Sequence, residues 1–284
     1  MEPRVAARVP SWIGEGALYH PDQEAVYWVD IPPGDLYRYD PATDDHELLH
    51  TDPPIGGFTF QADGSVLYFG GEGRVRIWDD GETESVREDI EGEEGMRFND
   101  VIADPEGRVF AGTMTDADHS VGRLYRIDTD GSVARLEDEI QLPNGMGFSP
   151  DEETFYLVET NTNTIYRYDY DGATGDLSNR EVFARADAEW GYDGLTVDAD
   201  GGVWTGLWGG SAVVRHTPDG EIDERIDVPA EHVTTLSFGG DAYETAYVSS
   251  ATYEAPVTDA KAGRLFSVET DHRGRPEHYS DVRP

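Results

Sequence analysis

The chain of 284 residues contains no cysteine and no apolar run long enough to cross a membrane. The lack of cysteine excludes a disulfide framework and thiolate chemistry. A membrane-spanning helix needs about 18 or more consecutive apolar residues, so we expect none here. The first residues, "MEPRVAARVP", lack the apolar core of a secretory signal. We therefore expect a cytoplasmic protein that does not act at a membrane.

Basic residues are also scarce. There are 21 Lys and Arg residues against 59 Asp and Glu residues, which gives a net charge of −38, and Lys261 is the single lysine. This balance disfavours nucleic acid as a partner, because such binding depends on neutralising phosphates. It fits the surface of a protein from a halophilic organism, whose self-repulsion is screened at high salt. Most carboxylates are then expected to be solvated surface groups rather than site residues.

Helical periodicity is nearly absent, and short β-rich runs such as "AVYWVD", "SVLYFG" and "TFYLVE" recur between turn-forming clusters. Six similar units begin near residues 16, 56, 99, 144, 193 and 232, and most continue into a third and a more polar fourth strand. This rhythm predicts an all-β fold, a six-bladed β-propeller with four-stranded blades around a central channel, as one domain over residues 1–284. "RVAARVP" would supply the strand that closes the last blade. A β-sandwich or a pair of barrels is the alternative.

Oxygen-bearing side chains stand where the first strands of four units begin: Glu15, Asn99, Asn144 and Asp193. Each of them alone also fits an ordinary turn residue. In a propeller, however, these strand starts converge on one mouth of the channel. Two carboxylates and two carboxamides suit a hard divalent cation, and the lack of His or Cys argues against a structural zinc site. A second "GEG", around Glu72, falls between two strands of the second unit, so we expect Glu72 in a solvated turn.

The segments "GEGALYHPDQEAVYWVDIPPGDLYRYDP", "MRFNDVIADPEGRVFAGTM", "LPNGMGFSPDEETFYLVET", "YDGLTVDADGGVW" and "TTLSFGGDAYETAYVSS" span nearly the whole chain. In these segments the sequence resembles the SMP-30/gluconolactonase/regucalcin family, six-bladed propellers that bind one divalent metal and hydrolyse sugar lactones. The resemblance implies that Glu15, Asn144 and Asp193 ligate the metal. It also implies that Arg97 binds substrate oxygens and that Asn99, beside the metal, contacts substrate, metal or water. "TDADHS" departs from the family pattern after "AGTM" and offers Asp116 as a loose candidate for a further substrate contact.

The resulting hypothesis is metal-dependent hydrolysis of a sugar lactone to its aldonic acid. The metal acts as a Lewis acid on the carbonyl and Asp193 as the general base. An oxygen-only site leaves the cation open among Ca, Mg, Mn, Fe and Zn. The sequence determines neither the particular lactone, nor the source of the leaving-group proton, nor the oligomeric state. Two alternatives are an esterase or organophosphate hydrolase using the same site, and a non-catalytic metal-binding propeller.

Overall fold

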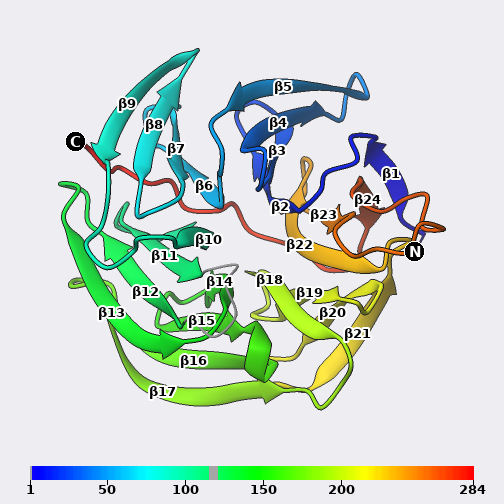
Figure 1. The fold of residues 1–284 in the computed structure, drawn as a ribbon. Coiled ribbons are helices and arrows are strands. Elements are labelled where there is room, and N and C mark those ends of the chain that lie inside the picture. Colours follow the sequence, from blue (N-terminus) through cyan, green and yellow to red (C-terminus); the bar gives the residue numbers. More distant parts are fainter. Residues whose placement is uncertain (1, 115–120) are drawn as a thin grey trace.

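A computed structural model describes residues 2–114 and 121–284. In this part of the chain, 24 strands form six four-stranded antiparallel sheets arranged as the blades of a ring (Figure 1). The β-propeller predicted from the repeat is therefore confirmed. Blades one to three comprise β2 (Gly14–His20), β3 (Ala25–Asp30), β4 (Asp35–Asp40) and β5 (Asp45–Thr51); β6 (Gly57–Phe60), β7 (Val66–Phe69), β8 (Val75–Asp79) and β9 (Glu82–Arg87); and β10 (Arg97–Ala103), β11 (Val109–Met114), β12 (Gly122–Ile127) and β13 (Val133–Ile140).

Blades four to six complete the ring, and in each of the first five blades the earliest strand in the chain lies nearest the axis. They comprise β14 (Pro143–Phe148), β15 (Thr154–Glu159), β16 (Thr164–Asp171) and β17 (Asp176–Arg185); β18 (Gly191–Val197), β19 (Val203–Trp208), β20 (Ala212–His216) and β21 (Ile222–Asp227); and β22 (His232–Gly239), β23 (Thr245–Ala251), β24 (Leu265–Glu269) and β1 (Arg4–Ala7). A 3-10 turn, η1 (Thr160–Thr162), follows β15. The described residues contain no helix long and apolar enough to cross a bilayer.

The ring closes through the N-terminal strand, as the sequence predicted. Strand β1 is the outermost strand of blade six and pairs antiparallel with β24, Val5 opposite Phe266. Arg4 adds a hydrogen bond of 2.9 Å from Nε to Oγ of Ser267. Because the first and last parts of the chain share one sheet, opening the ring would break a full strand pairing.

The apolar core is divided among the six junctions between neighbouring blades. Each of the six clusters of buried apolar side chains draws on two adjacent blades, and Val282 of the C-terminal segment joins the cluster between blades two and three. At the junction of blades two and three, for example, Phe69 and Phe98 meet edge to face with ring centroids 5.2 Å apart. A blade therefore buries its two faces only by stacking on its neighbours, which is why the repeat forms a ring.

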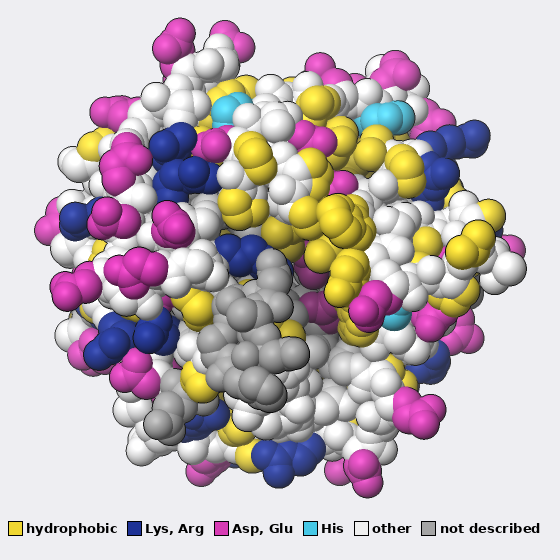
Figure 2. All heavy atoms as spheres, viewed as in Figure 1, with side chains coloured by type: hydrophobic (Ala, Val, Ile, Leu, Met, Phe, Trp, Pro, Cys, Tyr) yellow, Lys and Arg dark blue, Asp and Glu magenta, His cyan; other side chains and the backbone are white. Residues whose placement is uncertain are grey.

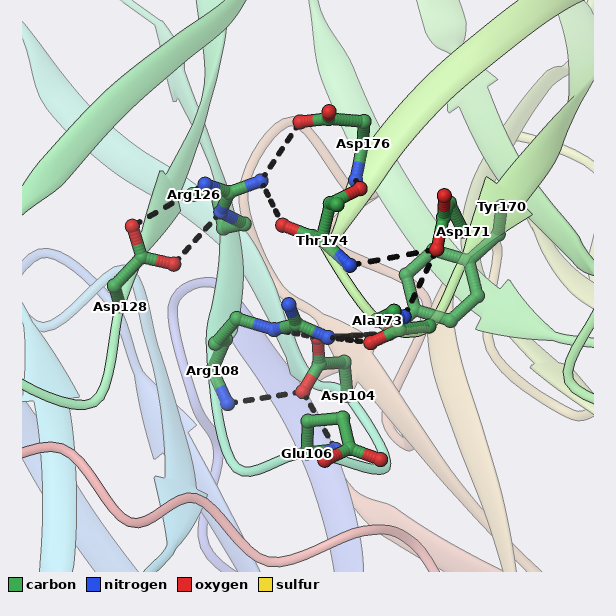
Figure 3. A network of polar contacts seen from close by, with 11 residues as sticks. Asp104, Glu106, Arg108, Arg126, Asp128, Tyr170, Asp171, Ala173, Thr174 and Asp176 are labelled. Carbon is green, nitrogen blue, oxygen red and sulfur yellow. Dashed lines mark hydrogen bonds and ion pairs between the residues drawn. The ribbon is translucent and has the colours of Figure 1, made fainter.

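Hydrogen bonds from two arginine side chains join blade three to blade four (Figure 3). Arg108 donates from Nη2 to the carbonyl oxygen of Gly172 at 2.6 Å, and Arg126 donates from Nη1 to that of Thr174 at 2.7 Å. Both acceptors lie in the turn between β16 and β17 of the next blade. Arg108 is held in turn by Asp104, with Nε and Oδ2 2.6 Å apart. A guanidinium offers several donors in fixed directions, so one side chain can serve two blades at once.

The C-terminal segment from residue 270 onwards crosses one mouth of the channel. It bonds to the end of β6 and to the turns that follow the inner strands of blades three, five and six, opposite the ends where these strands start. The backbone bonds run from Gly274 N to Tyr243 O, Ala199 N to Arg273 O, Ser280 N to Phe60 O, and Asp281 N to Gly107 O, all at 2.8 Å. A small cavity of about 20 Å³ lies between this segment and blades three to five. Because the segment lies across this mouth, we call the other mouth, where the inner strands begin, the open mouth and look there for a ligand site.

Candidate active site at the open mouth

Five of the six inner strands carry a β-bulge near their start, where two residues oppose a single residue of the second strand. The pairs of bulged residues are Gly16–Ala17, Asn99–Asp100, Asn144–Gly145, Asp193–Gly194 and Thr234–Thr235. The inner strand of blade two, β6, pairs without a shift. A bulge bends the strand and changes the direction of its side chains. This shared irregularity brings Asn99, Asn144 and Asp193 to the same level of the channel.

Gly145 and Gly194 allow close packing of strands and do not form turns, although Asn-Gly and Asp-Gly are common turn dipeptides. Both lie inside strands, and neither has a positive φ. A Cβ on Gly145 would lie 2.2 Å from the backbone nitrogen of Leu195, and one on Gly194 would lie 2.3 Å from the Thr235 side chain. Glycine is therefore needed because the inner strand of the next blade passes so close. The turn interpretation of Asn144 and Asp193 is replaced by a bulge at a blade junction.

Glu15 departs by one residue from the phase expected from the repeat. It pairs with Val29 before the bulge of β2, so that Gly16, with φ of +60°, occupies the position equivalent to Asn144 and Asp193. Glu15 is nonetheless buried and lies within electrostatic reach of Asp193. The expectation that Glu15 stands in register with the other strand starts is thus wrong, although its carboxylate still faces the same cluster.

Asn144 and Asp193 interact directly across the junction of blades four and five. Nδ2 of Asn144 donates to Oδ1 of Asp193 and, at 3.2 Å, to Oγ1 of Thr160. The Thr160 hydroxyl itself donates to the carbonyl oxygen of Tyr192 at 2.8 Å. This arrangement fixes the amide of Asn144 so that its oxygen points away from these partners, and it leaves Oδ2 of Asp193 for a further ligand.

Arg97 and Asn99 form a second rigid unit beside this pair. Nη1 of Arg97 donates to Oδ1 of Asn99 at 2.8 Å and to the carbonyl oxygen of Phe98 at 3.0 Å. Nδ2 of Asn99 donates to the carbonyl oxygen of Pro143 at 3.0 Å. Both ends of the Asn99 amide are therefore engaged by the protein. This arrangement suits Asn99 for orienting Arg97 and a substrate, rather than for serving as a free amide ligand.

The electrostatics of the cluster favour a cation. Burial raises the pKa of Glu15 well above its ordinary value, and the Asp193 and Asp100 carboxylates raise it further. Burial and then Asp100 also raise the pKa of Asp193, whereas the hydrogen bond from Asn144 lowers it. Loss of water raises the pKa of Asp100 to about 6. Among the described residues no ion pair reaches Glu15 or Asp193.

The donor set fits a hard divalent cation. Two buried carboxylates, each with a raised pKa, and an immobilised amide oxygen are the ligands that Ca²⁺ and Mg²⁺ prefer, and water would fill the remaining positions. Within residues 2–114 and 121–284 there is no group of three or more His, Cys, Asp or Glu side chains placed to hold a metal. A cation here would therefore depend on the Asn144 amide as well as on the carboxylates.

Asp100 and Thr160 contribute to the site but were not predicted from the sequence, and one predicted residue, Asp116, stays untested. Asp100 shares the bulge with Asn99, at the position that blades four and five fill with glycine; comparing "ND" with "NG" and "DG" could have singled it out. Thr160 carries no such signal, because it comes from the turn after β15. Asp116 lies outside the described residues.

Arg97 also lines a hollow of about 510 Å³ between blades one, two and three at the open mouth. Figure 2 shows this face, where hydrophobic side chains gather to one side of the centre and carboxylates crowd the periphery. Glu72 lies in the turn between β7 and β8, exposed and with φ of 60°, as expected. The sequence did not predict that this turn borders the hollow that Arg97 lines.

Fold and site together define a six-bladed propeller with an oxygen-donor cluster at the mouth where its inner strands begin. The family profile described as SMP-30/gluconolactonase/LRE-like region matches residues 13–252. The chain therefore belongs to this family, as its resemblance indicated.

Two relatives and one solved structure illustrate the family. The pentonolactonase of Haloferax volcanii is 45% identical over 95% of both chains. The 6-deoxy-6-sulfogluconolactonase of Pseudomonas putida is 31% identical over 87% of this chain and 86% of its own. The crystal structure of regucalcin from Agrobacterium tumefaciens, described as a calcium-binding protein, superposes with a TM-score of 0.90. It is 28% identical and covers 97% of this chain and 96% of its own.

Proposed function

We propose that the protein is a lactonase that hydrolyses a sugar lactone to the aldonic acid at a divalent cation held by Glu15, Asn144 and Asp193. The observation that carries this proposal is the buried Asn144–Asp193 pair beside Glu15, at the open mouth of the channel. Carboxylates that lie close together in a buried site cost free energy when both are ionised, unless a cation neutralises them. The family to which the chain belongs and its lactonase relatives support the choice of reaction.

In this mechanism Asp193 acts as the general base. Its carboxylate takes a proton from a water molecule whose oxygen forms the new bond to the lactone carbonyl carbon. The bond between that carbon and the ring oxygen then breaks, and the ring oxygen leaves as an alcohol after receiving a proton. When bound, the cation supplies Lewis-acid polarisation of the carbonyl. Asn144 holds the Asp193 carboxylate in position through its Nδ2.

Arg97 and Asn99 would bind the hydroxyl groups of the lactone in this scheme. Their mutual hydrogen bond fixes the guanidinium before substrate arrives, which reduces the entropy lost on binding. Asp116 is retained as a proposed substrate contact from the sequence pattern alone. We propose Ca²⁺ as the first cation to test, because oxygen ligands with an open coordination sphere suit it and a structural relative is described as calcium-binding.

The net charge of −38 supports a further proposal, a salt-rich cytoplasm as the working environment. The pentonolactonase that resembles this chain comes from a halophile. Hydrolysis should accordingly be measured at high potassium chloride concentration.

A pH-indicator assay over pentono- and hexonolactones, an aryl ester and an organophosphate tests the proposal. Each substrate is tested with metal-loaded protein, after chelation, and after re-addition of single cations. We expect lactone hydrolysis that disappears on chelation and returns with one divalent cation. Turnover of the ester or organophosphate alone would instead favour a different hydrolase, and no turnover would favour a metal-binding propeller.

A further inference from the structure

The hollow beside Arg97 is formed by a turn of blade two that is hydrogen-bonded to blade three. Glu72 N donates to the carbonyl oxygen of Met96 at 2.8 Å, and Phe98 N donates to that of Gly70 at 3.0 Å. These bonds continue the backbone pairing between Gly71 and Arg97. The turn is therefore fixed relative to Arg97, and so are its charged residues Glu72 and Arg74.

Arg74 is held in a defined orientation at the wall of the hollow. Its Nη2 donates to the carbonyl oxygen of Pro53 at 3.1 Å and lies 3.6 Å from Oδ1 of Asp52. A Cβ on Gly70 would come within 2.9 Å of Nε and Nη2, so glycine at this position makes room for the guanidinium. The Arg74 side chain keeps 22% of its surface exposed. The protein thus positions one side of the guanidinium and leaves part of it available to a ligand.

The chemistry of the hollow matches a small polyhydroxylated ring. Its lining residues include the apolar Ile31, Pro54 and Met96 and the charged Arg74, Arg97 and Glu72. Its volume of about 510 Å³ lies in the range of pockets for small ligands. Each sugar hydroxyl can both donate and accept a hydrogen bond. A guanidinium and a carboxylate across one hollow can therefore bind neighbouring hydroxyls, while the C–H face of the ring contacts the apolar wall.

The charges argue for a neutral sugar rather than an anionic ligand. Glu72 lines the hollow, and Asp52 lies behind Arg74, so that these carboxylates offset the positive charge of the two arginines. The chain as a whole carries a net charge of −38, which repels anions. A hydroxylated, uncharged lactone therefore suits the charges around the hollow better than an anion does.

We propose that this hollow receives the hydroxylated carbons of the lactone that lie away from its carbonyl. Arg74 acts there as donor, Glu72 acts as acceptor, and both determine which lactone is hydrolysed best. The inference rests on the lactonase function proposed above and adds the substrate-selecting side of the same site. Ribono-1,4-lactone and the unhydroxylated γ-butyrolactone share the reacting ring and differ in their hydroxyls, so their ratio of kcat/KM isolates the proposed contacts.

The experiment compares this ratio in the wild type, Arg74→Gln, Glu72→Gln and the matched control Arg167→Gln, whose side chain is 47% exposed and paired with Glu181 on blade four. We expect the ratio to fall about tenfold in Arg74→Gln, through KM more than kcat, and less in Glu72→Gln. Arg74→Lys should recover part of the loss, because it keeps the charge but not the fork. The control should keep the wild-type ratio.

An unchanged ratio in both Arg74→Gln and Glu72→Gln, with active wild type, would overturn the substrate-selecting role and leave the lactonase function standing. Wild type that opens neither lactone would instead overturn the lactonase function itself. If circular dichroism shows that Arg74→Gln is unfolded, Glu72→Gln decides the question, because Glu72 is exposed in its turn.

Discussion

Asn144 of blade four donates a hydrogen bond to the carboxylate of Asp193 in blade five, and both residues stand on β-bulges at the same level of the channel. The contact spans a blade junction, so the geometry of the site depends on how closely the two inner strands approach. Gly145 and Gly194 permit that approach. A change that moves the two inner strands apart would therefore also change the geometry of the proposed cation site.

Gly145→Ala is expected to lower both stability and cation affinity. The added Cβ would meet the backbone of Leu195 at 2.2 Å, and forced overpacking costs about 1–3 kcal/mol. Gly172→Ala is the matched control, since its Cβ would meet only Tyr170 at 3.8 Å. Denaturant unfolding of both variants measures the difference. Equal stability of the two variants would show that the junction can relax.

Cation binding is expected to release protons at mildly acidic pH. Because the raised pKa values of Glu15 and Asp193 lie above those of the unfolded chain, the cation-free fold binds more protons than the unfolded chain between the two values. Its stability should therefore fall as pH rises from about 4 through the raised values, and cation should restore it. Titration calorimetry in buffers of different ionisation enthalpy counts the protons. Binding without proton release in this window would contradict the assigned ligands.

The C-terminal segment is expected to depend on Gln61. Its side chain donates from Nε2 to the carbonyl oxygen of Val282 at 2.9 Å and accepts from Val282 N at 3.0 Å, and it is buried. Gln61→Leu leaves that backbone unpaired, at a cost of about 1–3 kcal/mol. Hydrogen exchange should show faster exchange of the Val282 amide, and not in a variant of the exposed Gln141. Unaltered protection of Val282 would mean that the segment is held by its other bonds alone.

Salt is expected to stabilise the fold. With a net charge of −38, repulsion between carboxylates opposes the compact state, and screening relieves it. Most of the rise in Tm should come below about 1 M potassium chloride, where the screening length falls from about 10 Å at 0.1 M to about 3 Å. Thermal scans over this range test the prediction. A Tm that does not respond to salt would contradict adaptation to a salt-rich interior.

The sequence predicted the ring because its determinants are local. Each unit shows its strands and turns through β-rich runs and glycine or aspartate clusters, whereas "RVAARVP" was expected as the closing strand only because a propeller ring has to close. The bulges could not be predicted, since they arise when one blade packs on the next. That is why Glu15 was placed one residue out of register, and why the turn interpretation of Asn144 and Asp193 stayed open.

The same reason explains what was missed around the hollow. Glu72 was correctly expected in a turn from its local sequence. This turn lies beside Arg97 because hydrogen bonds join it to Met96 and Phe98, 24 or more residues further along the chain. Such contacts join separate repeats, and the repeat pattern carries no information about them.

The most direct test of the proposed site is Asp193→Asn, assayed for lactone hydrolysis and cation affinity beside Asp200→Asn, an exposed neighbour in the same blade. Asparagine keeps the shape but loses the charge and the basicity. We predict that kcat falls by at least about a hundredfold and that the cation binds more weakly, while circular dichroism stays that of the wild type and Asp200→Asn behaves as the wild type. Lactone hydrolysis at close to the wild-type rate in Asp193→Asn, with an unchanged cation requirement, would contradict the assignment.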